Sequence, residues 1–211
     1  MASVVDICNL ALSHIGQDAN ISSIDPPEGS ADAEHAVRFY RIAFGMVLQS
    51  HPWSFASKRI ALALLADTQD PWLYAYALPS DCVKTRRVIP AVAGDDHNGV
   101  RFLREGSTIY TNEADARLVY TFEQTDPTTF TPGFVTALSW LLASYMAGPV
   151  LKDTTGQAQA RAYQMYQREA GLAMTADANS DRNPPPYIPS AILARFGVTS
   201  TFDAPSGTPV A

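Results

Sequence analysis

The hydrophobic pattern of this 211-residue chain changes twice along its length. Apolar residues recur at helical spacing as far as Pro52, alternate from about Ile60, and return to helical spacing from Thr131. Two helical ends around a strand-forming middle imply that the terminal helices pack together and that the sheet is inserted between them. The sequence therefore predicts an α+β fold: a helical bundle from the N- and C-terminal helices, an inserted small antiparallel β-sheet domain and an extended C-terminal tail.

Capping residues indicate where the two N-terminal helices begin and end. Ser3 followed by Asp6 forms a capping-box pattern, and Gly16 can stop the helix that follows. Ser30 is placed to cap a longer second helix, which Pro52 ends because proline cannot continue the backbone hydrogen-bond ladder. The stripe expected to be buried on this second helix comprises Ala33, Val37, Tyr40, Phe44 and Val47 or Leu48.

Six short runs in the middle of the chain have the composition and the flanking turn residues of strands. We expect them to form one small antiparallel sheet, with a hairpin that turns near Gly106. The runs cover residues 60–65, 72–78, 83–89, 100–103, 108–111 and 116–122.

Residues 127–151 carry no charge, and most of this segment is apolar. A membrane span needs about 20 apolar residues. Here Thr131 and Pro132 can open a helix and Gly148-Pro149 can close it, which leaves a helix of only about 20–25 Å. The sequence therefore predicts a helix buried on most sides in the bundle rather than a membrane span.

These patterns divide the chain into four segments: N-terminal helices 1–57, an inserted β domain 58–126, C-terminal helices 127–182 and an interaction tail 183–211. The last helix is expected over about 155–177. Three prolines at 184–186 cannot extend that helix and make the start of the tail stiff. Apolar residues beyond them are expected to gain order on a partner or a neighbouring subunit, namely Tyr187, Ile188, Ile192, Leu193 and Phe196.

Composition argues against a nucleic-acid-binding surface and against a disulfide framework. The formal net charge is -6 and the pI is about 5.1, so no chain-wide basic field attracts phosphate. Cys8 and Cys82 are the two cysteines, and we expect both to be reduced thiols. The N-terminus lacks the basic and long apolar regions of a signal peptide.

No familiar catalytic, cofactor or metal motif occurs in the sequence, such as a phosphate-binding glycine loop or His-Glu-x-x-His. The three residues Asp95-Asp96-His97 could ligate a metal, but an exposed turn accounts for them better. The dipeptide Asp81-Cys82 could suggest a nucleophile, yet no histidine stands in a recognisable partner pattern. We therefore expect no catalytic, cofactor-binding or metal-binding residues, and we expect Cys82 to lie buried at the start of a strand.

Two further groups of residues are candidates for structural or interface roles. Lys84, Arg86 and Arg87 form the densest basic cluster, which is either the solvated edge of a sheet or a patch that meets an acidic face of a neighbouring subunit. Trp53 and Phe55 flank the junction between helix and strand and are expected to fix the helical part to the sheet.

Three runs together resemble the head-to-tail adaptor (tail tubular protein A) family of short-tailed bacteriophages. They are residues 7–16, ICNLALSHIG, residues 51–59, HPWSFASKR, and residues 74–82, YAYALPSDC. The resemblance extends over about residues 4–175. Each run is a packing and turn pattern, so the specificity lies in their order and spacing.

The resemblance implies a structural virion protein without enzymatic activity or cofactor, assembled in the host cytoplasm into the tail. Subunits of that family form a twelvefold ring below the portal, which leads DNA into the tail nozzle and in many phages helps to hold the fibres. DNA would pass without specific binding, no membrane would be involved, and the tail residues from Tyr187 to Phe196 would meet the portal or a neighbour. A soluble adaptor or chaperone unrelated to phages, and a tail-associated hydrolase, stay open as alternatives.

Overall fold

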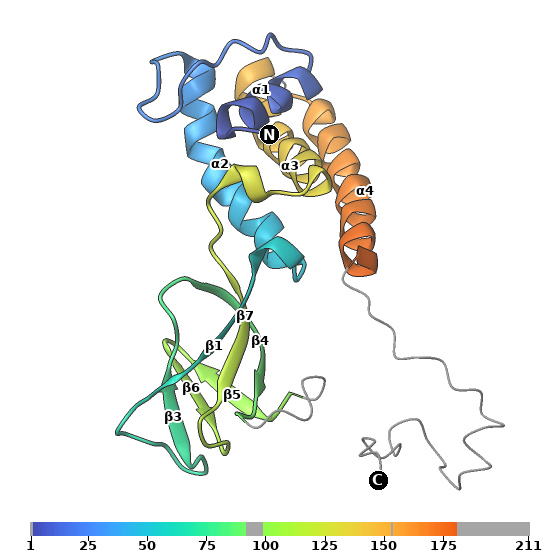
Figure 1. The fold of residues 1–211 in the computed structure, drawn as a ribbon. Coiled ribbons are helices and arrows are strands. Elements are labelled where there is room, and N and C mark those ends of the chain that lie inside the picture. Colours follow the sequence, from blue (N-terminus) through green and yellow to red (C-terminus); the bar gives the residue numbers. More distant parts are fainter. Residues whose placement is uncertain (1, 92–98, 153, 181–211) are drawn as a thin grey trace, which may run out of the picture. The chain divides into compact units, whose positions relative to one another are not determined.

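The computed structural model describes residues 2–91, 99–152 and 154–180, and within them the fold is α+β, as predicted. Helices α1 (Val4–His14) and α2 (Ala31–Ser50) precede the strands, and α3 (Pro132–Leu151) and α4 (Gln157–Ser180) follow them (Figure 1). Both helical pairs and the strands between them belong to one compact unit, Met1–Ser180. The segment boundaries proposed above stay predictions, and the tail residues 183–211 and the Asp95-Asp96-His97 turn lie outside the described residues.

The predicted starts of α1, α2 and α3 are confirmed by their caps, whereas α4 begins at Gln157 and ends at Ser180, each two or three residues later than expected. Ser3 Oγ accepts a bond from the backbone N–H of Asp6, and Asp6 Oδ2 accepts one from the backbone N–H of Ser3 at 2.8 Å. These bonds favour the charged carboxylate and lower the pKa of Asp6. Ser30 caps α2 and Thr131 caps α3 in the same manner, each through its side-chain oxygen.

Helix α3 is the central element of the bundle because it packs against each of the other three helices. It is long and apolar enough to cross a membrane by length and composition, yet more than half of its apolar window is buried inside the protein. The prediction that Gly148-Pro149 closes this helix is wrong, since α3 continues to Leu151 and ends where Lys152 adopts φ 53°. A proline in the last turn removes only one ladder hydrogen bond, so the helix can continue for two more residues.

The bundle core joins both ends of the chain, as the change in periodicity predicted. Ile7 and Ala11 of α1 belong to the same buried cluster as Phe134 and Leu138 of α3. On α2 the predicted stripe is wrong at Val37, which is exposed. The small residues Ala36 and Ala43 lie inside instead, because they allow the helices to approach closely.

The strands form two antiparallel sheets rather than the single sheet expected. The first sheet has the order β1-β7-β4, with β1 at Ser57–Ala61, β7 at Arg117–Phe122 and β4 at Cys82–Ile89. The second has the order β2-β3-β6-β5, with β2 at Ala63–Leu64, β3 at Tyr74–Ala77, β6 at Thr108–Thr111 and β5 at Phe102–Glu105. Alternation along a strand specifies its two faces but not its pairing partner, so the sequence could not separate the sheets.

The two sheets bury one shared apolar core that is separate from the bundle core. Tyr76 and Ile109 come from the second sheet, and Leu118 and Tyr120 come from the first. The β5–β6 hairpin turns at Gly106, as predicted, with φ 55° at the glycine. Glycine tolerates that left-handed conformation without steric cost.

Candidate functional site

The segment 51–56 connects α2 to β1, and its aromatic side chains are inserted into the bundle. Trp53 is fully buried, and its indole Nε1–H donates to the carbonyl oxygen of Val47 at 2.8 Å. The rings of Trp53 and Phe55 both meet Phe134 of α3 edge-on, with centroid separations of 5.2 and 5.0 Å. Phe130 adds a fourth ring, 5.0 Å from Phe134. The chain therefore leaves the bundle at a point that aromatic packing holds rigid.

A buried carboxylate from α4 reaches the same connection. Asp177, whose side chain is 5% exposed, accepts bonds from the backbone N–H of Ser54 at 3.0 Å and from Ser54 Oγ at 2.7 Å. His51 Nε2 lies 3.3 Å from the second carboxylate oxygen. These contacts fix the C-terminal end of α4 to the exit of α2, over 123 residues of sequence.

This Ser–Asp–His group has the composition of a hydrolytic triad but not its geometry. In a triad the histidine contacts the serine hydroxyl and removes its proton, and the carboxylate orients the histidine. Here Ser54 Oγ donates directly to Asp177, and the carboxylate separates it from His51. The arrangement is therefore a hydrogen-bonded clamp between α4 and the connection.

The three residues of the predicted basic cluster, Lys84, Arg86 and Arg87, make different contacts. Arg86 Nε donates to Thr121 Oγ1 at 3.0 Å, and its terminal nitrogens donate to Ser57 Oγ and the Trp53 carbonyl oxygen. Lys84 is exposed, and its Nζ donates to the carbonyl oxygen of Gln49 at the end of α2. Arg87 lies half-buried on the same edge strand. Arg86 thus joins the sheet to the connection, and a contact of the cluster with a neighbouring subunit stays a prediction.

Asp81, in the turn before β4, links two neighbouring strands of the first sheet. Asp81 accepts a bond from Lys58 Nζ at 2.8 Å and one from the Tyr120 hydroxyl at 2.9 Å. The bond from Lys58 lowers the pKa of Asp81 and correspondingly raises the pKa of Lys58. Cys82 begins β4 but is half-buried rather than buried, which corrects the expectation, and partial burial raises the pKa of its thiol.

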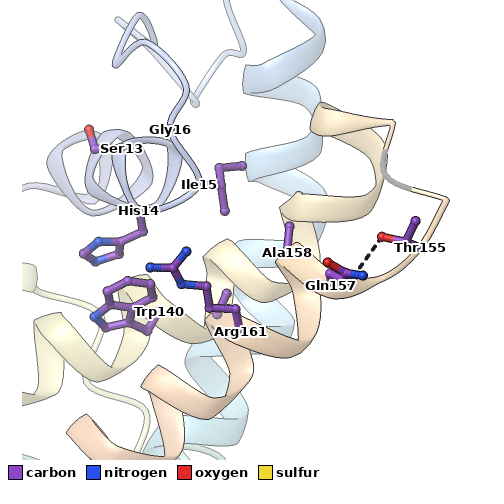
Figure 2. Close-up of a pocket in the computed structure, with 10 residues that line it drawn as sticks. Ser13, His14, Ile15, Gly16, Trp140, Thr155, Gln157, Ala158 and Arg161 are labelled. Carbon is purple, nitrogen blue, oxygen red and sulfur yellow. Dashed lines mark hydrogen bonds between the residues drawn. The ribbon is translucent and has the colours of Figure 1, made fainter.

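A cavity of about 820 Å³ lies where the end of α1 meets α3 and the start of α4 (Figure 2). The rings of His14 and Trp140 stack there with centroids 3.7 Å apart, and Arg161 extends from α4 toward them. Ser139 Oγ donates to the carbonyl oxygen of Thr136, so the proton between Ser139 and His14, 3.0 Å apart, belongs to His14 Nε2. Burial lowers the pKa of His14, which favours the neutral ring.

Sequence reasoning missed both the clamp and this ring pair. His14 and Trp140 are 126 positions apart, and no local pattern links them. Asp177 did carry a signal, because it follows Ala170 and Ala173 at helical spacing on the buried side of α4. Within the described ranges, no three His, Cys, Asp or Glu side chains are grouped as metal ligands.

Comparison of the sequence with known proteins finds no relative of this chain. The chain matches no protein-family model, and no curated protein is detectably similar to it.

Proposed function

We propose that this protein is the head-to-tail adaptor subunit of a short-tailed bacteriophage. It would form a ring, in twelve copies, between the portal and the tail nozzle, and it would line part of the DNA channel. Fibres could also attach to such a ring. The subunit would assemble in the host cytoplasm, become part of the virion tail, and act without catalysis, cofactor or membrane.

One observation carries the proposal: of the three runs that resemble the adaptor family, residues 51–59 connect the bundle to the first sheet. Trp53 and Phe55 of this run pack on Phe134 of the bundle. Lys58 of the same run donates to Asp81 of the run 74–82, which also accepts a bond from Tyr120 in the sheet. A subunit that transmits position between portal and nozzle needs such a fixed joint between its parts.

Charge supports a passive DNA channel. Each lysine or arginine paired with phosphate adds salt-dependent affinity, which would slow the passage of the genome. The net charge of -6 gives the chain no overall attraction for phosphate, and the two cations Arg86 and Lys84 of its densest basic cluster are engaged in internal hydrogen bonds. The channel side of the ring is therefore proposed to be neutral to acidic.

The geometry of the clamp weighs against the hydrolase alternative. Ser54 donates to a carboxylate and not to a histidine, so nothing in this group would generate an alkoxide. The soluble adaptor or chaperone alternative differs in its assembly state and is separated by the experiment below.

Native mass spectrometry and electron microscopy of the full chain mixed with the portal protein of the same phage test the proposal. A ring of this chain on the portal is the expected result. A chain that stays monomeric with the portal at high concentration would refute the adaptor function and favour the chaperone. Loss of a measured hydrolytic activity on replacement of Cys82 or Ser54 would instead favour an enzyme.

A further inference from the structure

Two large apolar side chains stand exposed on one side of α2. Ile42 is 55% exposed and Met46 is 48% exposed, and a spacing of four residues places them on the same helix face. The hydroxyl of Tyr145 lies 2.9 Å from Met46 Sδ and extends this surface onto α3. Single exposed apolar residues are ordinary, but a contiguous group marks an interaction surface. We call Ile42, Met46 and Tyr145 the α2 patch.

The charges around the α2 patch are positive. Arg38 precedes Ile42 by four residues on the same face, and Lys84 Nζ binds the carbonyl oxygen of Gln49 at the other end. Glu34 lies one turn before Arg38 on this face, beyond the apolar residues; no carboxylate follows it in α2, and α3 has none along its whole length. A partner for this patch should therefore be apolar with negative charges beside it.

A second exposed surface of the same chain has that composition. Leu64 ends β2 and is 62% exposed, and Leu73 precedes β3 and is 65% exposed. The loop between them contains Asp67 and Asp70, both exposed, and no lysine or arginine of its own, although the guanidinium of Arg101 reaches its end and lies 5.4 Å from the centroid of the Trp72 ring. Among the described residues neither carboxylate has an ion-pair partner. We call residues 64–73 the acidic leucine loop.

We infer that the acidic leucine loop of one copy docks on the α2 patch of a second copy. Leu64 and Leu73 would cover Ile42 and Met46, while Asp67 and Asp70 would face Arg38 and Lys84. The contact joins two different surfaces, so repetition produces a closed ring or an open filament rather than an isolated dimer. The inference rests on the proposed ring and names the contact between its subunits.

The charge of the acidic leucine loop indicates which kind of partner it binds, and the usual size of an interface indicates how large the contact is. The two carboxylates repel phosphate and anionic lipid, so they favour a protein partner over nucleic acid or membrane. A stable interface buries about 800 Å² on each partner, so the leucines serve as anchors within a larger contact.

Disulfide trapping tests the contact directly. We expect the double variant Met46→Cys/Leu73→Cys, mildly oxidised at high concentration, to give a ladder of covalent oligomers on non-reducing gels. All variants carry Cys82→Ser, because the native thiol there is only half-buried. Each single variant should then give no ladder, because a head-to-tail bond needs both introduced cysteines. The control Leu172→Cys/Leu73→Cys uses an equally apolar position, 59% exposed on α4, and should remain monomeric. A double variant no more cross-linked than this control would overturn the inference.

Charge exchange provides a second readout that a change in folding would not reproduce. Arg38→Asp and Asp70→Arg should each abolish oligomers in native mass spectra, and their combination should restore them. Failure of the combination to restore oligomers would overturn the pairing. If the wild-type chain forms a ring but the Met46→Cys/Leu73→Cys variant does not cross-link, this contact is refuted and the adaptor function stands. If the double cysteine variant does not cross-link and the wild-type chain does not assemble on the portal, both the contact and the adaptor function are refuted.

Discussion

Asp177 is a buried charged side chain that links the end of α4 to the connection between α2 and β1. A buried carboxylate loses its hydration, and only direct hydrogen bonds offset that loss. Ser54 supplies one to each carboxylate oxygen, and His51 lies against Oδ2, which also accepts the Ser54 backbone N–H. The sequence marked the position as part of a helix face but could not identify partners more than 120 residues away.

Replacing this carboxylate by its amide tests the clamp. We expect Asp177→Asn to lower the free energy of unfolding by about 1–3 kcal/mol, because the amide loses the charge and one acceptor oxygen. Urea denaturation at pH 7 measures the loss. Asp18→Asn, exposed between α1 and α2, is the matched control and should change stability by less than about 0.5 kcal/mol. Equal stability of the two variants would show that the clamp contributes nothing.

The thiol of Cys8 provides a pH-dependent test of the bundle core. Burial raises its pKa from 9.0 to about 12. Between these values the unfolded chain loses this proton while the folded protein keeps it, so stability falls as pH rises above 9.0. Cys8→Ala should reduce that slope by about 1 kcal/mol per pH unit between pH 9.0 and 10.0, and the tyrosines, which both proteins share, cancel in the comparison.

Denaturation curves at several pH values measure this slope. Val47→Ala removes volume from the same buried cluster without removing a titratable group. It should lower stability equally at each pH. Parallel pH profiles of wild type and Cys8→Ala would contradict the assigned burial.

At the scale of elements, local signals predicted helix starts and turns better than they predicted pairing. Ser3, Ser30 and Thr131 cap their helices as expected, because a cap depends on residues only three apart. The division into two sheets depends on which strands meet in space, and Leu62, the single residue between β1 and β2, gave no local indication of it. Long-range pairing was therefore the part that the sequence could not supply.

A tight contact between α3 and α4 at Gly133 allows a prediction at the scale of elements. A Cβ on Gly133 would lie 2.8 Å from Cβ and 3.2 Å from Cα of Ala173. Gly133→Ala should therefore lower the free energy of unfolding by about 1–3 kcal/mol through overpacking. The double variant Gly133→Ala/Ala173→Gly should recover part of that loss in thermal or urea denaturation.

Gly171→Ala on α4 is the matched control for this contact. No atom lies within 4 Å of the added Cβ, so the change should stabilise the protein by about 0.5–1 kcal/mol through helix propensity. Destabilisation of similar size at both glycines would mean that the helices do not meet at Gly133.

For the whole molecule, the proposed DNA channel predicts weak interaction with nucleic acid. Purified protein should not bind duplex DNA measurably at physiological salt, because net charge -6 provides few phosphate contacts. Fluorescence anisotropy with a labelled duplex, repeated at low salt, measures this. Tight, salt-resistant binding would contradict a channel through which DNA slides freely.

The apolar cores of the whole molecule predict what removal of the tail should do. The described buried clusters run from Ile7 to Ala173, and the clamp at Asp177 closes the end of α4. Truncation after Arg182 should therefore leave the cooperative unfolding transition of the full chain unchanged.

On the proposed function, the same truncation should lose stable docking on the portal, because it removes Tyr187, Ile188, Ile192, Leu193 and Phe196. Co-sedimentation with portal rings measures docking, and a variant that replaces only these five residues with serine separates their role from that of tail length. Undiminished docking by both variants would mean that the tail is a passive extension and that the portal contacts the bundle or the sheets.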